Sequence, residues 1–137
     1  MIPIRVIKDK GKVIAIIYRN EDWVKGLNFL TPSDLNIQVS SWYYHKGEKV
    51  ASHIHKVNPR QVDRTHEVTY VKQGKMKVLL YDENKKLIKE FISSEGDLTV
   101  YAYGGHGYEI LEDNTQVIEV KNGPFIGVSL DKEKFEG

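Results

Sequence analysis

Short runs of β-forming residues, separated by turn signals at regular intervals, dominate the second half of this chain. Between residues 66 and 123 the runs are about five to seven residues long, the usual length of a strand. The turn signals between them are Gln73-Gly74, 82–84, 93–96, Gly104-Gly105 and 112–114. Regular short strands with turns between them are typical of a β-sandwich or a β-barrel. Since no stretch has the apolar period of an amphipathic helix, the pattern predicts an all-β antiparallel fold.

The first half of the chain follows a looser version of this pattern. Residues 2–20 contain two β-branched runs separated by a polar turn, which predicts a hairpin or two successive edge strands. Residues 21–36 have no sustained period and end in Thr-Pro-Ser-Asp turn chemistry, so we expect a loop with one short helical turn. The strand pattern returns over residues 37–45 and, after Gly47, over residues 49–55.

Length and composition indicate one globular domain that spans residues 1–137. A chain of 137 residues is long enough to bury its own core and too short for two domains. With 40% apolar and 28% charged residues, disorder of the whole chain is excluded. The 20 basic and 19 acidic residues are interspersed, so charge gives no reason to expect a nucleic acid or membrane partner. A small-molecule substrate remains as the expected partner.

The absence of cysteine restricts the chemistry of any site. It removes disulfides, thiolate zinc sites and cysteine nucleophiles, so a bound metal would need nitrogen and oxygen ligands. The first twelve residues lack the apolar core and cleavage site of a secretory signal, and no run approaches the roughly 20 apolar residues of a membrane span. We therefore expect a cytoplasmic protein.

Three histidines and one glutamate are spaced as metal ligands would be. His53 and His55 are two residues apart, which on a strand places both imidazoles on one face. Glu67 lies on the next β-like run, where a cross-strand carboxylate would complete a two-histidine, one-carboxylate set. His106, aimed by the flexible Gly104-Gly105 pair, is available as a fourth ligand. The set suits one divalent ion of iron, manganese, nickel, cobalt, zinc or copper, and the sequence does not choose among them.

His66 competes with Glu67 for the inward position, because adjacent strand residues face opposite sides. With Glu67 as the ligand, His66 is expected to face outward. Residues 56–65, which contain Asn58-Pro59, are expected to form an irregular loop between the histidine pair and Glu67.

The same residues resemble two sequence motifs of the cupin family. Residues 47–74 are similar to the first motif, G(X)5HXH(X)3,4E(X)6G, and residues 96–110 to the second, G(X)5PXG(X)2H(X)3N. The chain departs from the motifs by its longer spacing between His55 and Glu67, by Ala102 in place of proline and by Ile110 in place of asparagine. The resemblance implies a single-domain jelly-roll β-barrel that holds a divalent metal through His53, His55, Glu67 and His106.

A looser likeness leads to small cupins associated with surface-polysaccharide biosynthesis. It is carried by residues 65–78, which read T-x-E-V-x-Y-V-x-x-G-K-x-x-V, and by residues 104–125. This likeness implies a role in carbohydrate metabolism.

Other residues are candidates for substrate binding or proton transfer. Arg60 and Arg64 lie on the expected loop, where planar guanidinium groups suit a carboxylate or phosphate. Glu109, three residues beyond His106, and the tyrosines Tyr101 and Tyr103 are candidate groups for moving a proton near the metal.

These residues favour an enzyme that uses its metal as a Lewis acid on a sugar or sugar phosphate, as an isomerase or epimerase does. An iron-dependent dioxygenase is the first alternative. A non-catalytic module that binds a carbohydrate or small acid through the metal is the second. We also expect a homodimer, because the N-terminal strands offer unpaired edges and the aromatic-rich strand at Trp42 offers apolar surface.

Overall fold

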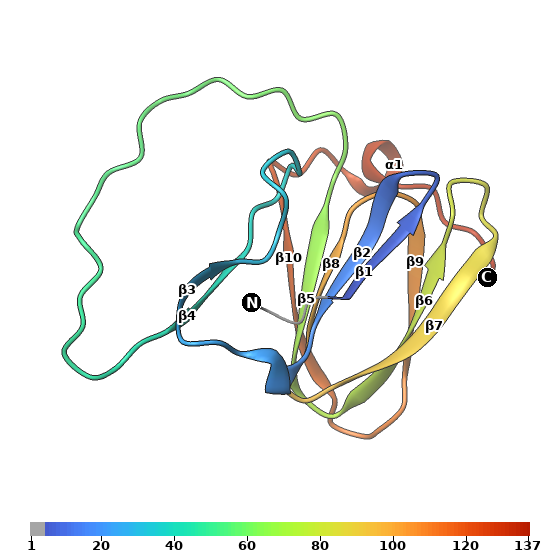
Figure 1. Cartoon of the computed structure of the whole chain (residues 1–137). Coiled ribbons are helices and arrows are strands. Elements are labelled where there is room, and N and C mark those ends of the chain that lie inside the picture. Colours follow the sequence, from blue (N-terminus) through green and yellow to red (C-terminus); the bar gives the residue numbers. More distant parts are fainter. Residues whose placement is uncertain (1–4) are drawn as a thin grey trace.

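The computed structural model describes residues 5–137 and folds them into two facing antiparallel sheets and a separate hairpin (Figure 1). The larger sheet has five strands, in the spatial order β1 (Arg5–Asp9), β2 (Lys12–Tyr18), β8 (Leu98–Tyr101), β5 (Glu67–Gln73) and β10 (Gln116–Lys121). The smaller sheet has the order β7 (Leu87–Ser94), β6 (Lys75–Tyr81) and β9 (Gly105–Ile110). The hairpin consists of β3 (Gly26–Phe29) and β4 (Ser40–Tyr43).

Helix in the described residues is confined to a 3-10 turn, η1 (Asn20–Asp22), and one short helix, α1 (Val128–Asp131). The predicted all-β antiparallel class is therefore confirmed. The predicted N-terminal hairpin is also confirmed, since β1 and β2 pair around Lys10-Gly11. Within residues 5–137 no helix has the length and apolar character that crossing a bilayer requires.

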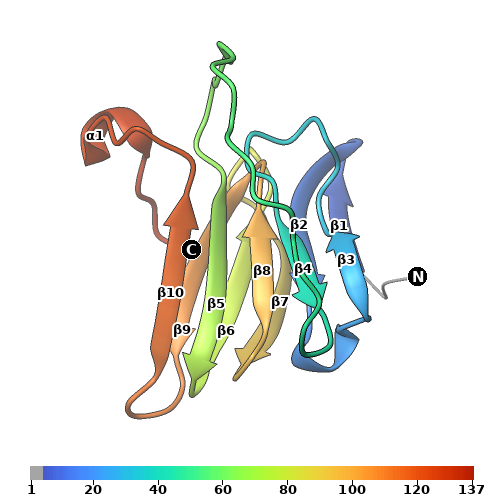
Figure 2. The same cartoon turned by 90° about the vertical axis from the view of Figure 1, so that its left-hand side faces the viewer.

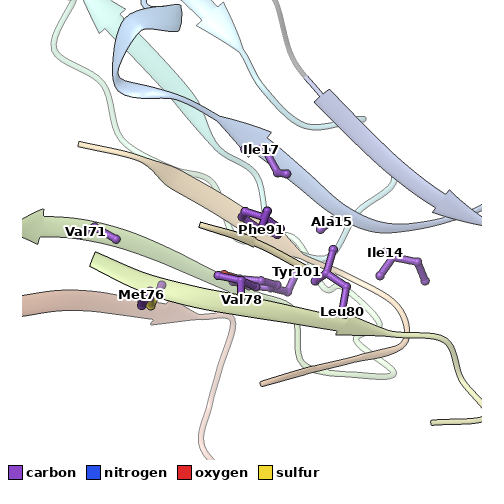
Figure 3. Close-up of a cluster of buried hydrophobic side chains, with 9 residues drawn as sticks. All are labelled: Ile14, Ala15, Ile17, Val71, Met76, Val78, Leu80, Phe91 and Tyr101. Atoms are coloured by element: carbon purple, nitrogen blue, oxygen red, sulfur yellow. The ribbon is translucent and has the colours of Figure 1, made fainter. Parts of the chain in front are cut away.

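The main core lies between the two sheets and follows from strand alternation. Met76, Val78 and Leu80 occupy every second position of β6 and are almost fully buried, so one face of that strand points inward. Figure 3 shows this cluster, whose members are Ile14, Ala15, Ile17, Val71, Met76, Val78, Leu80, Phe91 and Tyr101. Each large apolar side chain buried here stabilises the fold by about 1.5–3 kcal/mol.

A second buried cluster covers the outer face of the larger sheet. Leu35 and Ile37, from the segment between β3 and β4, pack over Val68 of β5 and Val100 of β8. Figure 2, viewed from this side, shows the β3–β4 hairpin in front of the larger sheet. The larger sheet is therefore covered on both faces over its central strands.

Residues 44–65, which we call the arm, have no regular secondary structure and run in a wide loop away from the sheets (Figure 1). Every arm side chain from residue 44 to residue 64 is exposed. The irregular loop predicted for residues 56–65 is confirmed. The strand predicted for residues 49–55 is absent from this structure, because among residues 5–137 no strand pairs with the arm and accepts its backbone hydrogen bonds.

Candidate functional site

Glu67 and His106 meet where the two sheets open to solvent. Glu67 begins β5 in the larger sheet, and His106 lies near the start of β9 in the smaller one. Nε2 of His106 is 2.5 Å from Oε2 of Glu67. The glutamate side chain is 9% exposed and the histidine side chain 30% exposed, so solvent reaches the pair from the histidine side.

The turn that leads into β9 sets the position of His106. Gly104 has a φ of +73°, a left-handed conformation that glycine adopts without strain. A Cβ atom at this position would lie 2.3 Å from the carbonyl oxygen of Tyr81. The chain turns closely against the end of β6 here, and His106 then pairs with Leu80 in the β6–β9 ladder.

Two tyrosines pack around the pair. The ring centroid of Tyr101 lies 4.6 Å from that of His106, and Tyr108 lies 5.5 Å from His106. The Tyr108 hydroxyl donates a hydrogen bond of 3.2 Å to Oε2 of Glu67. Burial raises the pKa of Tyr101 to about 12 and also raises the pKa of Tyr108. Both hydroxyls are therefore protonated at neutral pH, and that of Tyr108 holds one orientation of the Glu67 carboxylate.

Glu119 and Lys121 of β10 complete the polar cluster. Lys121 pairs with Glu67 in the β5–β10 ladder, and its Nζ lies 3.8 Å from Oε1 of Glu67 and 3.2 Å from Oε1 of Glu119. Lys121 also lines a cavity of about 210 Å³, together with Thr65, Asn122 and Phe125 among other residues. Lys121 is thus the residue that links this cluster to a neighbouring recess of small-molecule size.

The charges of this cluster move the pKa values of its carboxyl groups apart. Burial alone raises the pKa of Glu67, but hydrogen bonds with His106 and Glu119 and the charges of His106 and Lys121 outweigh it and lower the pKa to about 2. The hydrogen bond with Glu67, followed by burial and the charge of Glu67, raises the pKa of Glu119. Glu67 is therefore the permanently ionised member of the carboxyl pair.

The structure brings together two of the four predicted metal ligands. His53 and His55 lie on the arm, exposed, with ring centroids 5.2 Å apart, and Nδ1 of His53 is 2.8 Å from the carbonyl oxygen of Ala51. In the part of the chain that the structure describes, no group of three or more His, Asp or Glu side chains is placed to hold a metal ion. The histidine pair and the Glu67–His106 pair are thus separate in this conformation.

The candidate proton-transfer residues are divided between different surfaces. Tyr101 belongs to the cluster and shares a 2.9 Å hydrogen bond with Thr69. Glu109 faces the opposite side of β9 from His106 and forms an ion pair with Lys77, with 3.0 Å between Oε2 and Nζ. Neither Glu109 nor Lys77 reaches the mouth between the sheets.

Tyr103 and the two candidate arginines also lie away from the Glu67–His106 pair. The guanidinium carbon of Arg64 lies 4.6 Å from the ring centroid of Tyr103, and Arg64 reaches Glu83 at 3.6 Å. Arg60 is exposed on the arm, 3.5 Å from the carbonyl oxygen of Asn58. The structure therefore brings Arg64 and Tyr103 together, but at a different place from the metal-ligand pair.

His66 faces away from Glu67, on the outer face of the larger sheet as strand alternation predicted, but this part of the outer face is buried. The side chain is 1% exposed and packs against Tyr103, with ring centroids 5.6 Å apart. The backbone N–H of Asn36 donates a 3.2 Å hydrogen bond to its Nδ1. The cause is the segment between β3 and β4, which folds over this face of the sheet and buries it.

Sequence reasoning missed Glu119 and Lys121. The available signal was the alternation along β10, which places both side chains on the same face as Val117. That signal does not identify β5 as the partner strand, about 50 residues earlier in the chain, so it does not link these residues to Glu67.

The assembled cluster offers an oxygen and a nitrogen donor in contact, a neighbouring ammonium group and a more exposed carboxyl group. Together these groups are able to bind a cation or an anion and to exchange a proton. No family model, no curated protein and no solved structure matches this chain.

Proposed function

We propose that this protein is a small metal-binding enzyme of the cupin type, in which Glu67 and His106 hold one divalent metal ion together with His53 and His55. The observation that supports this proposal is the contact of 2.5 Å between the Glu67 carboxylate and the His106 imidazole at the open mouth. Carboxylate oxygen and imidazole nitrogen are the donor types that suit transition metals when no thiolate is present. The ionised state of Glu67 suits a ligand, because a ligating carboxylate must be deprotonated.

The free edge of β9 supports a role for the arm in completing this site. β9 is the last strand of its sheet, and Ile110, which shares a face with His106, is nevertheless 58% exposed. A further strand beside β9 would cover that side of the sandwich and close it toward a jelly-roll barrel. Arm residues 49–55 have the alternation of such a strand, which would present His53 and His55 on one face beside His106.

The residues around the pair fit a small polar substrate such as a sugar or sugar phosphate. A metal bound here would act as a Lewis acid on a carbonyl or hydroxyl oxygen of the substrate. Lys121, which lines the adjacent cavity, is placed to bind an anionic group. Glu119 is the more exposed carboxyl group of the mouth and is better placed than Glu109 to exchange a proton with a substrate. We therefore propose an isomerase or epimerase.

Elemental analysis of protein purified without added metal tests the site. We expect one equivalent of a divalent metal in the wild-type protein and a large loss in the His53→Ala and His106→Ala variants. Glu109→Gln, which alters a carboxylate on the outer face of β9, is the matched control and should retain the metal. Equal metal content in all four proteins would remove the site from consideration.

Two assays test the reaction class. Deuterium uptake from heavy water into sugars and sugar nucleotides should depend on the metal if the protein abstracts a proton. Oxygen consumption by the ferrous protein with thiols, catechols and diketones would instead indicate a dioxygenase. Thermal protection by sugars without turnover in either assay would indicate a binding module.

A further inference from the structure

We infer that the arm of one copy of this chain pairs with β9 of a second copy, so that each metal site takes His53 and His55 from its partner. This inference rests on the proposed function of the Glu67–His106 pair. It adds that the site is incomplete within one chain and that the partner copy supplies half of its ligands.

The direction of the arm is the first observation. Figure 1 shows the arm leaving the body on the side of the β3–β4 hairpin, whereas β9 lies in the sheet on the other side of the molecule. The five-stranded sheet stands between them. The arm thus extends away from the sheets of its own chain, as an exchanged element does in the open form of a swapped dimer.

The β3–β4 hairpin, from which the arm departs, exposes its large apolar side chains to solvent and turns its polar face toward the rest of the chain. Leu27, Phe29 and Trp42 are exposed by 48%, 72% and 56%. The paired residues Asn28 and Ser41 occupy the opposite face, and Ser41 is 3% exposed. A second copy that covers this apolar face would lie directly beside the start of the arm.

Charge provides a third and independent observation. The arm, residues 44–65, carries five lysine or arginine residues, Lys46, Lys49, Lys56, Arg60 and Arg64, against two acidic residues, Glu48 and Asp63. Residues 111–115, which connect β9 to β10, carry two acidic residues and no lysine or arginine: Glu112 and Asp113. The basic arm and this acidic connection at the end of β9 are complementary, which favours their association.

Length and hydrogen bonding fit the same pairing. An extended run over residues 49–57 is about 30 Å long and is able to cover β9, which is about 20 Å long. Ile54 and Val57 on this run are 90% and 97% exposed. Strand addition would satisfy the unpaired backbone groups of the arm and of the β9 edge together. A two-fold exchange would do so in both copies.

The test is a complementation of two inactive variants in a mixed dimer. The body variant carries Glu67→Gln and His106→Ala, and the arm variant carries His53→Ala and His55→Ala. Each variant alone should bind no metal. The two are refolded together with different tags that contain no histidine, and the doubly tagged dimer is isolated for elemental analysis.

With arm exchange, the wild-type arm of the body variant completes the wild-type body of the arm variant, so the mixed dimer should hold half the metal of the wild-type dimer. Without exchange, both chains hold only half a site and the mixed dimer should bind none. A mixed dimer of the body variant with Glu109→Gln is the control and should hold half the metal in either case, which shows that isolation itself preserves binding.

The outcomes separate the two proposals. A wild-type protein that binds no metal contradicts the proposed function and, with it, this inference. A wild-type dimer that binds metal while the mixed dimer binds none leaves the function intact and overturns the exchange. A wild-type protein that holds a full equivalent of metal as a monomer in sedimentation equilibrium also overturns the exchange.

Discussion

Lys121 lies directly opposite Glu67 in the ladder between β10 and β5, with its Nζ 3.8 Å from Oε1 of the carboxylate. The same ammonium group lies 3.2 Å from Glu119. A divalent metal on Glu67 would therefore bind close to a fixed positive charge, which opposes metal binding by electrostatic repulsion. A site that served metal binding alone would be expected to lack an ammonium group at this position. The presence of Lys121 therefore fits a second role, the binding of an anionic substrate.

Replacement of this ammonium group should separate the two tasks. We expect Lys121→Met to bind the divalent metal several-fold more tightly and an anionic ligand such as inorganic phosphate more weakly, because the like charge is gone. Competition against a coloured chelator measures the first effect, and calorimetric titration of the metal-loaded protein with phosphate measures the second. Lys77→Met, which removes an ammonium group on the outer face of β6, should change neither.

The Tyr108 hydroxyl donates to the carboxylate oxygen of Glu67 that also contacts His106. Tyr108→Phe removes this donor and keeps the ring, so metal affinity should fall by roughly ten- to a hundredfold while the fold persists. The dissociation constant from chelator competition is the measurement. Tyr70→Phe on the exposed face of β5 is the control, and an equal affinity in Tyr108→Phe and wild type would show that the hydroxyl does not support the ligand.

The strands and turns were predictable because their signals are local. Gly74 shows why: its left-handed φ of +87° is required by a tight connection between two adjacent strands, and the residues that form it are neighbours in sequence. The pairing of β5 with β10 brings together strands far apart in the chain, so the sequence pattern predicted Glu67 as a ligand without its neighbours Glu119 and Lys121.

The histidine pair illustrates the opposite case. Residues 49–55 have the alternation of a strand, but a strand exists only where another edge accepts its hydrogen bonds, and no described strand of the chain does so. His66 was placed on the correct face by alternation, yet its burial depends on the segment between β3 and β4, whose path has no periodic signal. In both cases a distant element decides the environment of the residue.

His66 makes the stability of the metal-free protein dependent on pH. Burial, followed by the charge of Arg64, lowers its pKa below the ordinary value of 6.5, and the opposing effect of Asp63 is smaller. Its Nδ1 accepts a hydrogen bond from Asn36, so a proton on that nitrogen would face a donor. Below about pH 6.5 the His66 imidazole binds a proton in the unfolded chain but not in the folded chain. The free energy of unfolding therefore falls as the pH falls.

Urea denaturation in the presence of a chelator, at about pH 7.5 and about pH 5.5, measures this effect. The His66→Gln variant should lose part of the difference in midpoint between the two pH values. His45→Gln, which alters an exposed histidine of the arm, should keep the whole difference. An unchanged pH dependence in His66→Gln would show that other groups cause it.

Gly104 should tolerate a side chain poorly, because two penalties combine there. Its left-handed φ of +73° costs an alanine about 1–2 kcal/mol, and the new Cβ would lie 2.3 Å from the backbone oxygen of Tyr81. Gly11 is the matched control, since its φ is +78° but no atom lies within 4 Å of the added Cβ. Gly104→Ala should therefore lower the free energy of unfolding in urea clearly more than Gly11→Ala. Because Gly104 leads into β9, it should also lower the metal content, whereas equal losses of stability in the two variants would contradict the close turn.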